Sequence, residues 1–264
     1  RLVGSEMCIR DSYTTYAGAY GLKTFQVNLG KYAKDSVGLR VNGSDLTIGN
    51  STAAHNATIK NFIKHTGNYV NSKTEVTTTG NILVYMDPGV SKLSISHDTE
   101  LSAKNSKSVT GIFVNGATKL VNKAKISITN SPESKGIIVT KGGITPDVEN
   151  YNDIIVEGKK SIGIANYGKF EQKEKATGVR TKIQATGENA IAVYTNNTTD
   201  PLKLNSVNLT VKDGAVGLYP EAAVGNKSTI ELRNVNIEVG KNALMLYNYT
   251  GTNAVSYTHL TLPT

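Results

Sequence analysis

The chain has 264 residues, a formal net charge of +8 at pH 7, 38% hydrophobic residues, no tryptophan and one cysteine. A single cysteine excludes a disulfide framework, and no window approaches the roughly 18 consecutive apolar residues of a membrane-spanning helix. Asn, Thr, Ser, Gly, Val and Ile are abundant and phenylalanine is scarce, which is a composition poor in helix-core residues and rich in strand and turn formers. We therefore expect an all-β chain.

Both ends of the chain differ in character from the rest. Residues 1–12 read RLVGSEMCIRDS and residues 255–264 read VSYTHLTLPT, and both resemble the translated adapter of transposase-based sequencing libraries. Codons for Met7–Asp11 and for Val255–His259 can be reverse complements of each other, and a GCT codon for Ala254 fits the same string. We expect 1–12 and 254–264 to be adapter-derived and non-native, with 1–12 and 255–264 outside the fold. Residues 13–253 are then a native segment, truncated at both ends; the alternative is a genuine N-terminal segment and tail.

A degenerate unit recurs along the chain: an alternating apolar strand, a short polar turn, then a small residue inside an aliphatic triplet. In chain order its copies read SVGLRVNG (36–43), TGNILVYMD (79–87), LSAKNSKSVTGIFV (101–114), ISITNSPESKGIIV (126–139), IIVEGKKSIGIANYG (154–168) and IQATGENAIAVY (183–194). The clearest pair follows, since residues 205–220 align without gaps on residues 233–248 at an offset of 28. The middle residues of the later triplets are spaced by 25, 27, 29, 25 and 28 residues: Gly111, Gly136, Gly163, Ala192, Gly217 and Met245.

Copies of this length and hydrophobicity cannot bury an apolar face alone, so they must stack on one another. Each copy is expected to hold two period-2 strands, and stacking equivalent strands gives parallel ladders around an elongated core. In the last copies the outer residues of the triplet, such as Ile191, Val216 and Leu244, are expected to face that core. The fold class predicted is a right-handed parallel β-helix with coils of about 25–29 residues, because the copies recur at that spacing. A β-sandwich is the alternative, but it does not explain why like residues recur at nearly equal spacing.

The triplets carry a family resemblance. SVGLRV, SIGIAN, AIAVYT and AVGLYP are similar to the repeats of autotransporter passenger regions, which are bacterial proteins of type V secretion, over roughly residues 36–250. The resemblance implies a right-handed β-helix exported through the outer membrane by a C-terminal β-barrel. It also implies display on the bacterial cell surface or secretion, and a role as an adhesin.

Catalytic chemistry has weak candidates in this sequence. Glu188 and Asp213 each lie four residues before a triplet centre, so we expect them to stack in neighbouring coils, flanked by Lys159 and Lys241. Two carboxylates in such a place are what a polysaccharide lyase or hydrolase needs, and a carbohydrate-active β-helix enzyme is the alternative function. A solvated charge ladder at a polar turn explains the same residues, so we predict no catalytic residues.

Metal and cofactor sites are not predicted. His55 and His65 have no acidic partner at metal-ligand spacing, and His97 beside Asp98 is a single dipeptide. No phosphate-binding glycine loop precedes a helix, so no cofactor is expected.

Tyrosines are the residues that we expect to bind a partner. Tyr194, Tyr219 and Tyr247 each follow the second aliphatic residue of their triplets, so alternation turns them outward and coil stacking places them in register. Such a ladder suits sugar rings or a protein edge, although stacking for stability beneath a loop is the alternative. With the net charge of +8, these residues suggest acidic glycans or host or neighbouring-cell surface proteins as partners, and no specific nucleic acid. The function expected is that of a noncatalytic surface scaffold.

Overall fold

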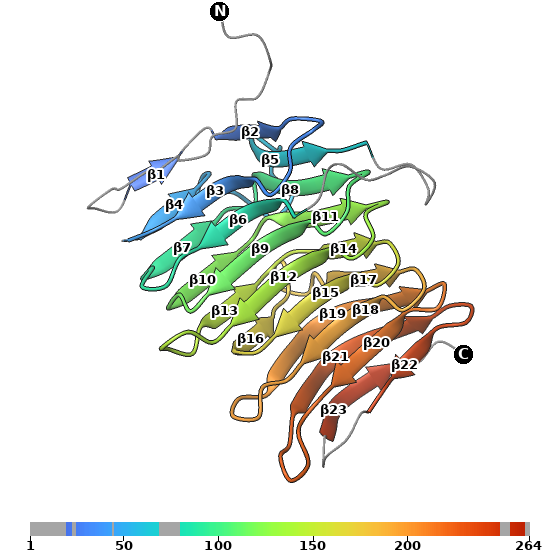
Figure 1. Ribbon diagram of the computed structural model, residues 1–264. Coiled ribbons are helices and arrows are strands. Elements are labelled where there is room, and N and C mark those ends of the chain that lie inside the picture. The colour runs from blue at the N-terminus through green and yellow to red at the C-terminus, as the bar shows by residue number, and fades with distance from the viewer. Residues whose placement is uncertain (1–19, 23–24, 44, 69–79, 249–253, 262–264) are drawn as a thin grey trace, which may run out of the picture.

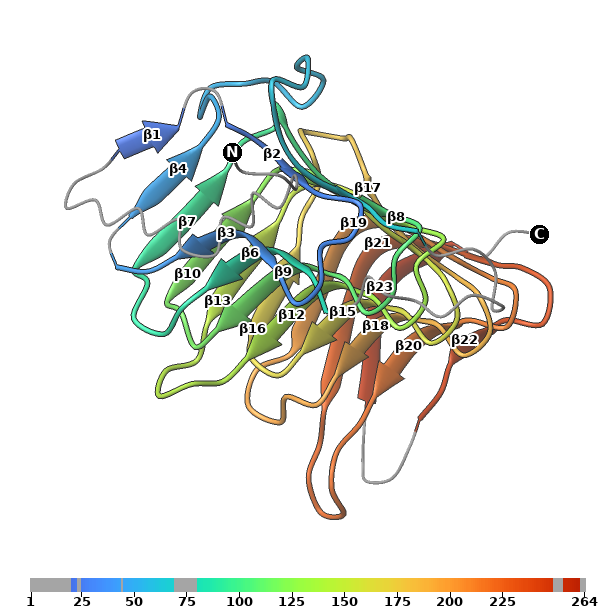
Figure 2. The ribbon, with the colours of Figure 1, turned by 45° about the horizontal axis from the view of Figure 1, so that its top comes forward.

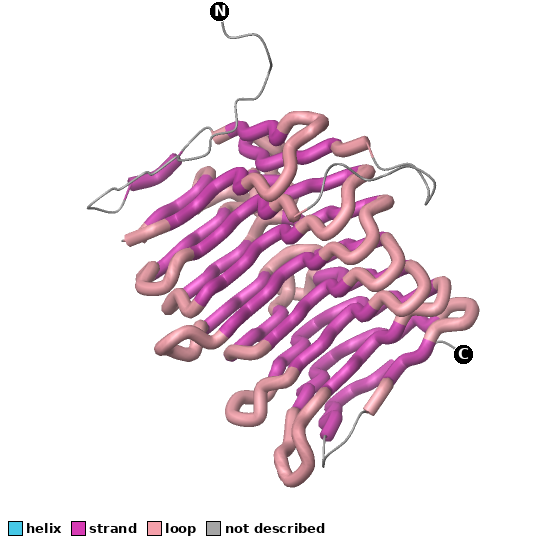
Figure 3. Tube along the Cα trace, in the orientation of Figure 1, coloured by secondary structure: helices cyan, strands magenta, loops and turns pink. Residues whose placement is uncertain are grey.

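The computed structural model describes residues 20–22, 25–43, 45–68, 80–248 and 254–261. Within these residues the chain forms 23 strands and no helix (Figure 3). Successive strands pair in parallel with strands of the coils above and below, so the molecule is a parallel β-helix, as the repeat predicts (Figure 1). The fold is a stack of coils with three strand-bearing faces.

The first face of the stack is formed by short strands. They are β1 (Tyr20–Leu22), β4 (Leu46–Ile48), β7 (Lys92–Ile95), β10 (Lys119–Asn122), β13 (Asp147–Asn150) and β16 (Lys169–Gln172). The second face follows in each coil and is formed by β2 (Gln26–Leu29), β5 (Asn61–Thr66), β8 (Thr99–Lys104), β11 (Lys125–Thr129), β14 (Ile154–Glu157) and β17 (Thr181–Thr186). In the later coils β19 (Leu202–Lys212) and β21 (Thr229–Val239) run through both faces as single strands, because β19 pairs with both β16 and β17.

The third face is a separate sheet of eight strands, which we call sheet B. Its strands are β3 (Val37–Val41), β6 (Ile82–Met86), β9 (Thr110–Asn115), β12 (Lys135–Thr140), β15 (Ile162–Asn166), β18 (Ile191–Thr195), β20 (Val216–Pro220) and β22 (Leu244–Leu246). These strands contain the aliphatic triplets. Figure 2 shows the connections that leave sheet B projecting from the later coils.

The expectation of two strands per copy is wrong, because most coils have three. The strand that was missed is the one on the first face, for example β10, β13 and β16. Each of these contains four residues, and only one or two of them are apolar. Such a segment is too short and too polar for a period-2 pattern to be recognised.

The register inferred from the repeat is confirmed. Val207 pairs with Val235 and Leu209 with Ile237, which is the offset of 28 found in the sequence. In sheet B, β12 pairs with β9 on one side and β15 on the other, so the triplets of successive coils lie over one another. Because register is set by stacking of like residues, the repeat fixes which side chains share a face.

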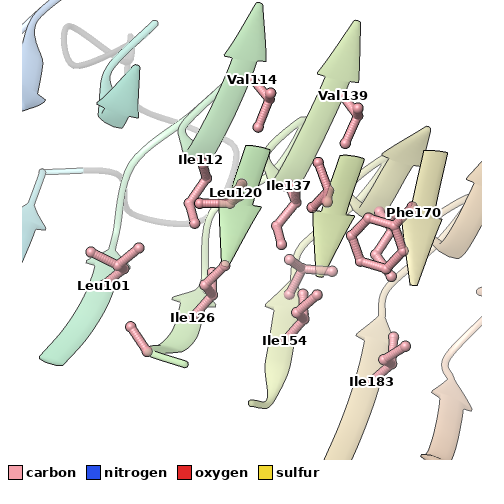
Figure 4. Close-up of a cluster of buried hydrophobic side chains, with 14 of the residues drawn as sticks. Leu101, Ile112, Val114, Leu120, Ile126, Ile137, Val139, Ile154, Phe170 and Ile183 are labelled. Atoms are coloured by element: carbon pink, nitrogen blue, oxygen red, sulfur yellow. The ribbon is translucent and has the colours of Figure 1, made fainter. Parts of the chain in front are cut away.

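The core runs the length of the stack as columns of aliphatic side chains. One column comes from the third residue of the triplet in five successive coils, and all of its members are fully buried: Ile112, Ile137, Ile164, Val193 and Leu218. The equivalent residue of the last triplet, Leu246, is 37% exposed. Figure 4 shows Ile112 and Ile137 pointing toward side chains of the other faces, such as Leu120 and Phe170.

The orientation expected for the first residue of each triplet is wrong. Ile191 and Val216 are only half-buried and Leu244 is 46% exposed. The cause lies in the small middle residue, which faces the interior. A Cβ added at Gly136 would lie 2.6 Å from Ile154 Cγ2 and 2.5 Å from Gly163 O. Two consecutive triplet positions therefore point inward, and the first residue turns to the outer surface.

A polar column also lies inside the stack, at the end of the first face. Asn122 Nδ2 donates to Asn150 Oδ1 at 2.6 Å, and Asn150 Nδ2 donates to Gln172 Oε1 at 2.8 Å. All three side chains are fully buried. Further bonds to the backbone carbonyls of Ala124 and Asn152 satisfy these amides, as buried polar groups require. The amide column holds the corner between the first and second faces in three successive coils.

The C-terminal segment departs from its expected behaviour. Residues Ala254–Thr261 form strand β23, which pairs in parallel with β21 from Thr229 to Asn236. The expectation that residues 255–264 take no part in the fold is therefore wrong for Val255–Thr261. The physical reason is that an edge strand presents unpaired N–H and C=O groups, and a segment containing Val, Tyr and Thr has the β propensity to satisfy them. The origin of this segment in an adapter stays a prediction, and residues 1–12 lie outside the described residues.

Candidate binding surface: a tyrosine column on sheet B

Sheet B carries the predicted tyrosines in register on its outer side. Tyr194 of β18 pairs directly with Tyr219 of β20, and Tyr247 follows β22 with its N–H bonded to Leu218 O at 2.9 Å. Their buried neighbours in the strands, such as Val193, point inward. The predicted outward alignment of these rings is thus confirmed.

The rings contact one another along the stack. Tyr194 and Tyr219 have centroids 5.6 Å apart with an interplanar angle of 79°, and Tyr219 and Tyr247 are 5.1 Å apart at 72°. These are edge-to-face arrangements, which the ring quadrupole favours. Each ring therefore leaves part of its face or edge on the outer surface while it stabilises its neighbour.

A fourth ring extends this set in a way that the sequence did not reveal. Tyr167 lies in the turn after β15, 38% exposed, with its centroid 5.6 Å from that of Tyr194. In β15 the position opposite Tyr194 is Ala165, so the small alanine leaves room for a ring from the turn. The only sequence signal was the turn motif Asn166-Tyr167-Gly168. We call Tyr167, Tyr194, Tyr219 and Tyr247 the tyrosine column.

Polar groups border the column in the connections that follow β18 and β20. The Tyr194 hydroxyl donates to Glu221 Oε2 at 2.6 Å, and Asn196 Nδ2 lies 3.4 Å from the same hydroxyl. Burial and the hydrogen bond to Glu221 raise the pKa of Tyr194 well above its usual value. This hydroxyl therefore stays protonated and anchors the carboxylate beside the rings.

The first residues of the triplets form a second row beside the column. Ile162 pairs with Ile191, Ile191 with Val216 and Val216 with Leu244, and all of them are partly or largely exposed. Ile191, Val216 and Leu244 are the residues that were expected to face the core. We call them, in the order Ile162, Ile191, Val216 and Leu244, the aliphatic row.

The predicted acidic pair does not form as expected. Glu188 is paired with Lys159 at 2.7 Å, and that bond lowers the pKa of this exposed carboxyl. Asp213 is displaced by one position, because Asn189 N–H bonds to Gly214 O and so sets Glu188 beside Gly214. The shift arises because the turn between β19 and β20 has three residues and the turn between β17 and β18 has four. A lowered pKa is the opposite of what a general acid needs.

Carboxylates gather instead on the outer side of the first face. Asp147 and Glu149 of β13 both bond Lys119 Nζ, at 2.5 and 2.9 Å. Lys173 bridges Glu149 at 3.2 Å and Glu171 at 3.6 Å. This acidic cluster is the arrangement nearest to what the alternative, enzymatic reading requires. Its carboxylates are neutralised by lysines and come from two coils, β13 and β16.

Acid should weaken this cluster. The pKa of Glu149 is lowered from 4.5 to about 2, because burial, which raises it, is outweighed by hydrogen bonds from Lys119, Tyr151 and Lys173. A depressed pKa means that the carboxylate stabilises the fold above pH 4.5 and that this contribution is lost as the pH falls toward about 2. We expect the Tm of the wild-type chain to fall more steeply over this interval than that of a Glu149→Gln variant. Equal slopes in the two melting series would contradict the assignment.

Two of the histidines, His65 and His97, are buried. His65 is buried, with Nε2 3.1 Å from Ser106 Oγ and Nδ1 3.4 Å from Leu29 O, and burial lowers its pKa. His97 is buried with its pKa lowered mainly by burial. The described residues contain no group of three or more His, Cys, Asp or Glu side chains arranged to hold a metal ion.

The described residues include no helix that is both long and apolar enough to cross a membrane. No protein-family model, no curated protein and no solved structure matches the chain.

Proposed function

We propose that the chain is part of a noncatalytic scaffold on the bacterial cell surface, or secreted through the outer membrane, that acts as an adhesin through the tyrosine column. The observation that carries the proposal is the run of four rings in successive coils, each 5.1–5.6 Å from the next. Tyrosine gives a rigid, amphipathic contact area at low entropic cost, which suits recognition. The surface location and export route rest on the resemblance of the triplets to autotransporter passengers.

The shape of the scaffold supports binding rather than turnover. Equivalent side chains recur coil after coil, so weak contacts add along the axis and avidity replaces a deep pocket. Catalysis would need a carboxyl group of raised pKa beside a partner that stabilises charge. Glu149 and Glu188 have lowered pKa values instead. The ligands proposed are glycans or surface proteins of a host or neighbouring cell.

Retention on immobilised ligands tests this proposal. The full chain is passed over acidic polysaccharides, neutral polysaccharides and matrix proteins, and soluble products are assayed for new reducing or unsaturated ends. Tyr194→Ala and Tyr219→Ala are each expected to weaken retention by about tenfold, as for an aromatic hot spot worth more than about 1 kcal/mol. Tyr32→Ala is the control, since Tyr32 is 67% exposed and lies outside the column.

Two outcomes would contradict the proposal. Retention that is unchanged in both column variants would show that the tyrosines serve only to stabilise the stack. Products that appear with the wild-type chain and vanish in an Asp147→Asn, Glu149→Gln double variant would instead establish the enzymatic alternative.

A further inference from the structure

We propose that the tyrosine column and the aliphatic row together bind an uncharged, linear glycan that lies along the stack axis. The inference rests on the proposed function and specifies the ligand class of the same surface. It departs from the acidic glycans that the net charge of +8 suggests.

The outer side of sheet B is apolar from β15 to β22, although the chain is basic and Lys135 of β12 pairs with Ile162 at the edge of this region. Over β15, β18, β20 and β22 the outward positions are held by isoleucine, valine, leucine, alanine and tyrosine. Ion pairs in the described chain lie on the other faces and turns, apart from Arg40–Asp87 at the far end of sheet B. The Glu221 carboxylate borders the column and accepts a hydrogen bond from the Tyr194 hydroxyl at 2.6 Å. This carboxylate would repel an acidic polymer at the border of the column.

The extent of the surface favours a chain molecule over a folded partner. With strands about 4.8 Å apart and a rise of about 3.3 Å per residue, four coils by four residues cover on the order of 250 Å². A stable protein interface buries about 800 Å² on each partner. A linear polymer needs only the narrow strip that the two rows provide, and each coil adds one more equivalent contact.

The backbone of sheet B also restricts how a partner binds. Hydrogen bonds between its strands run along the stack, so the outer side presents side chains and no unpaired ladder of N–H and C=O groups. A peptide therefore cannot add as a β-strand on this side. Sugar rings, in contrast, can place their C–H faces on the tyrosine and aliphatic side chains and direct hydroxyls to Glu221 and Asn196 at the border.

Calorimetric titration of the full chain with three hexasaccharides tests the ligand class. The probes are cellohexaose, which is uncharged, hexagalacturonate, which is acidic, and chitosan hexamer, which is cationic. Cellohexaose is expected to bind, with an affinity that is the same at low and high salt because no ion pair is involved. Tyr167→Ala should weaken it about tenfold, as loss of a hot-spot ring does, whereas Tyr32→Ala should leave it unchanged.

Charge substitutions on the surface separate this inference from the proposed function. Val216→Lys adds a cation to the aliphatic row, and it should shift the preference about tenfold toward hexagalacturonate, which corresponds to one favourable ionic contact. Wild-type binding that prefers hexagalacturonate and falls with salt would overturn the uncharged-ligand inference while leaving binding at the column intact. The chain could instead be retained only on proteins, with retention weakened by Tyr194→Ala and no hexasaccharide bound. That result would overturn the inference that the ligand is a glycan. Cellohexaose binding that is unaffected by Tyr194→Ala would show that the tyrosine column is not the binding site.

Discussion

Phe170→Ala is expected to destabilise the fold by about 3–5 kcal/mol, which is the usual cost of removing a buried aromatic side chain. Phe170 is fully buried in β16 and packs in register with Val148 of the neighbouring coil. Figure 4 shows its ring within the column of aliphatic side chains. Because interactions in a stack of coils are between neighbours, amide protection should be lost first in the adjoining coils. Urea denaturation and hydrogen exchange measure the two effects.

Two controls sharpen this test. Phe170→Leu keeps most of the volume and should cost less than about 1.5 kcal/mol. Leu244→Ala removes a side chain that is 46% exposed and should cost well below the 2–5 kcal/mol typical of a buried leucine. A uniform loss of protection along the whole chain in Phe170→Ala would argue for a single globular core instead of a stack.

Asn150→Asp is expected to destabilise the fold by about 3–5 kcal/mol at neutral pH, because it leaves an uncompensated charge in the interior. Asn150 is fully buried, and its Nδ2 donates to Gln172 Oε1 at 2.8 Å and to Asn152 O at 2.6 Å. An aspartate oxygen would face these two acceptors without a proton to donate.

The pH dependence of this variant gives an independent signature. A buried aspartate has a raised pKa in the folded state, so the penalty should grow as the pH rises above the unfolded pKa and shrink in mild acid, where the protonated group can donate again. Asn208→Asp is the control, since Asn208 is exposed and its Oδ1 accepts a hydrogen bond from Asn236 Nδ2 at 3.2 Å. The denaturant midpoints of the two variants, measured at neutral pH and in mild acid, test this expectation. A pH-independent penalty equal in the two variants would contradict the buried amide column.

The sequence predicted the stacking of coils because Val207, Leu209 and Leu218 recur at one offset, and stacked parallel strands demand that like residues meet. It did not predict the strands of the first face, where Leu120 and Val148 are flanked by polar residues. Nor did it predict the burial of Asn122 and Asn150, which is possible because each side chain bonds another amide one coil away. A hydrogen bond between the side chains of two coils leaves no pattern in the local sequence from which it could be predicted.

The sequence predicted only those parts of the candidate surface that follow the repeat. Tyr194 and Tyr219 occupy equivalent repeat positions, so alternation and register together place them correctly. Tyr167 comes from a turn, and Glu221 reaches Tyr194 from a connection between strands; neither follows the period. The orientation of Ile191 was reversed because the small middle residue of the triplet breaks simple alternation.

Amide chemical shifts of the isotopically labelled chain, followed during titration with cellohexaose, test the central claim most directly. The account predicts shift changes confined to β15, β18, β20 and β22 and to the residues that border Tyr167 and Glu221, while the hexasaccharide stays intact. Changes centred on Asp147 and Glu149 in β13, or the appearance of shorter oligosaccharides, would contradict binding without turnover at the tyrosine column.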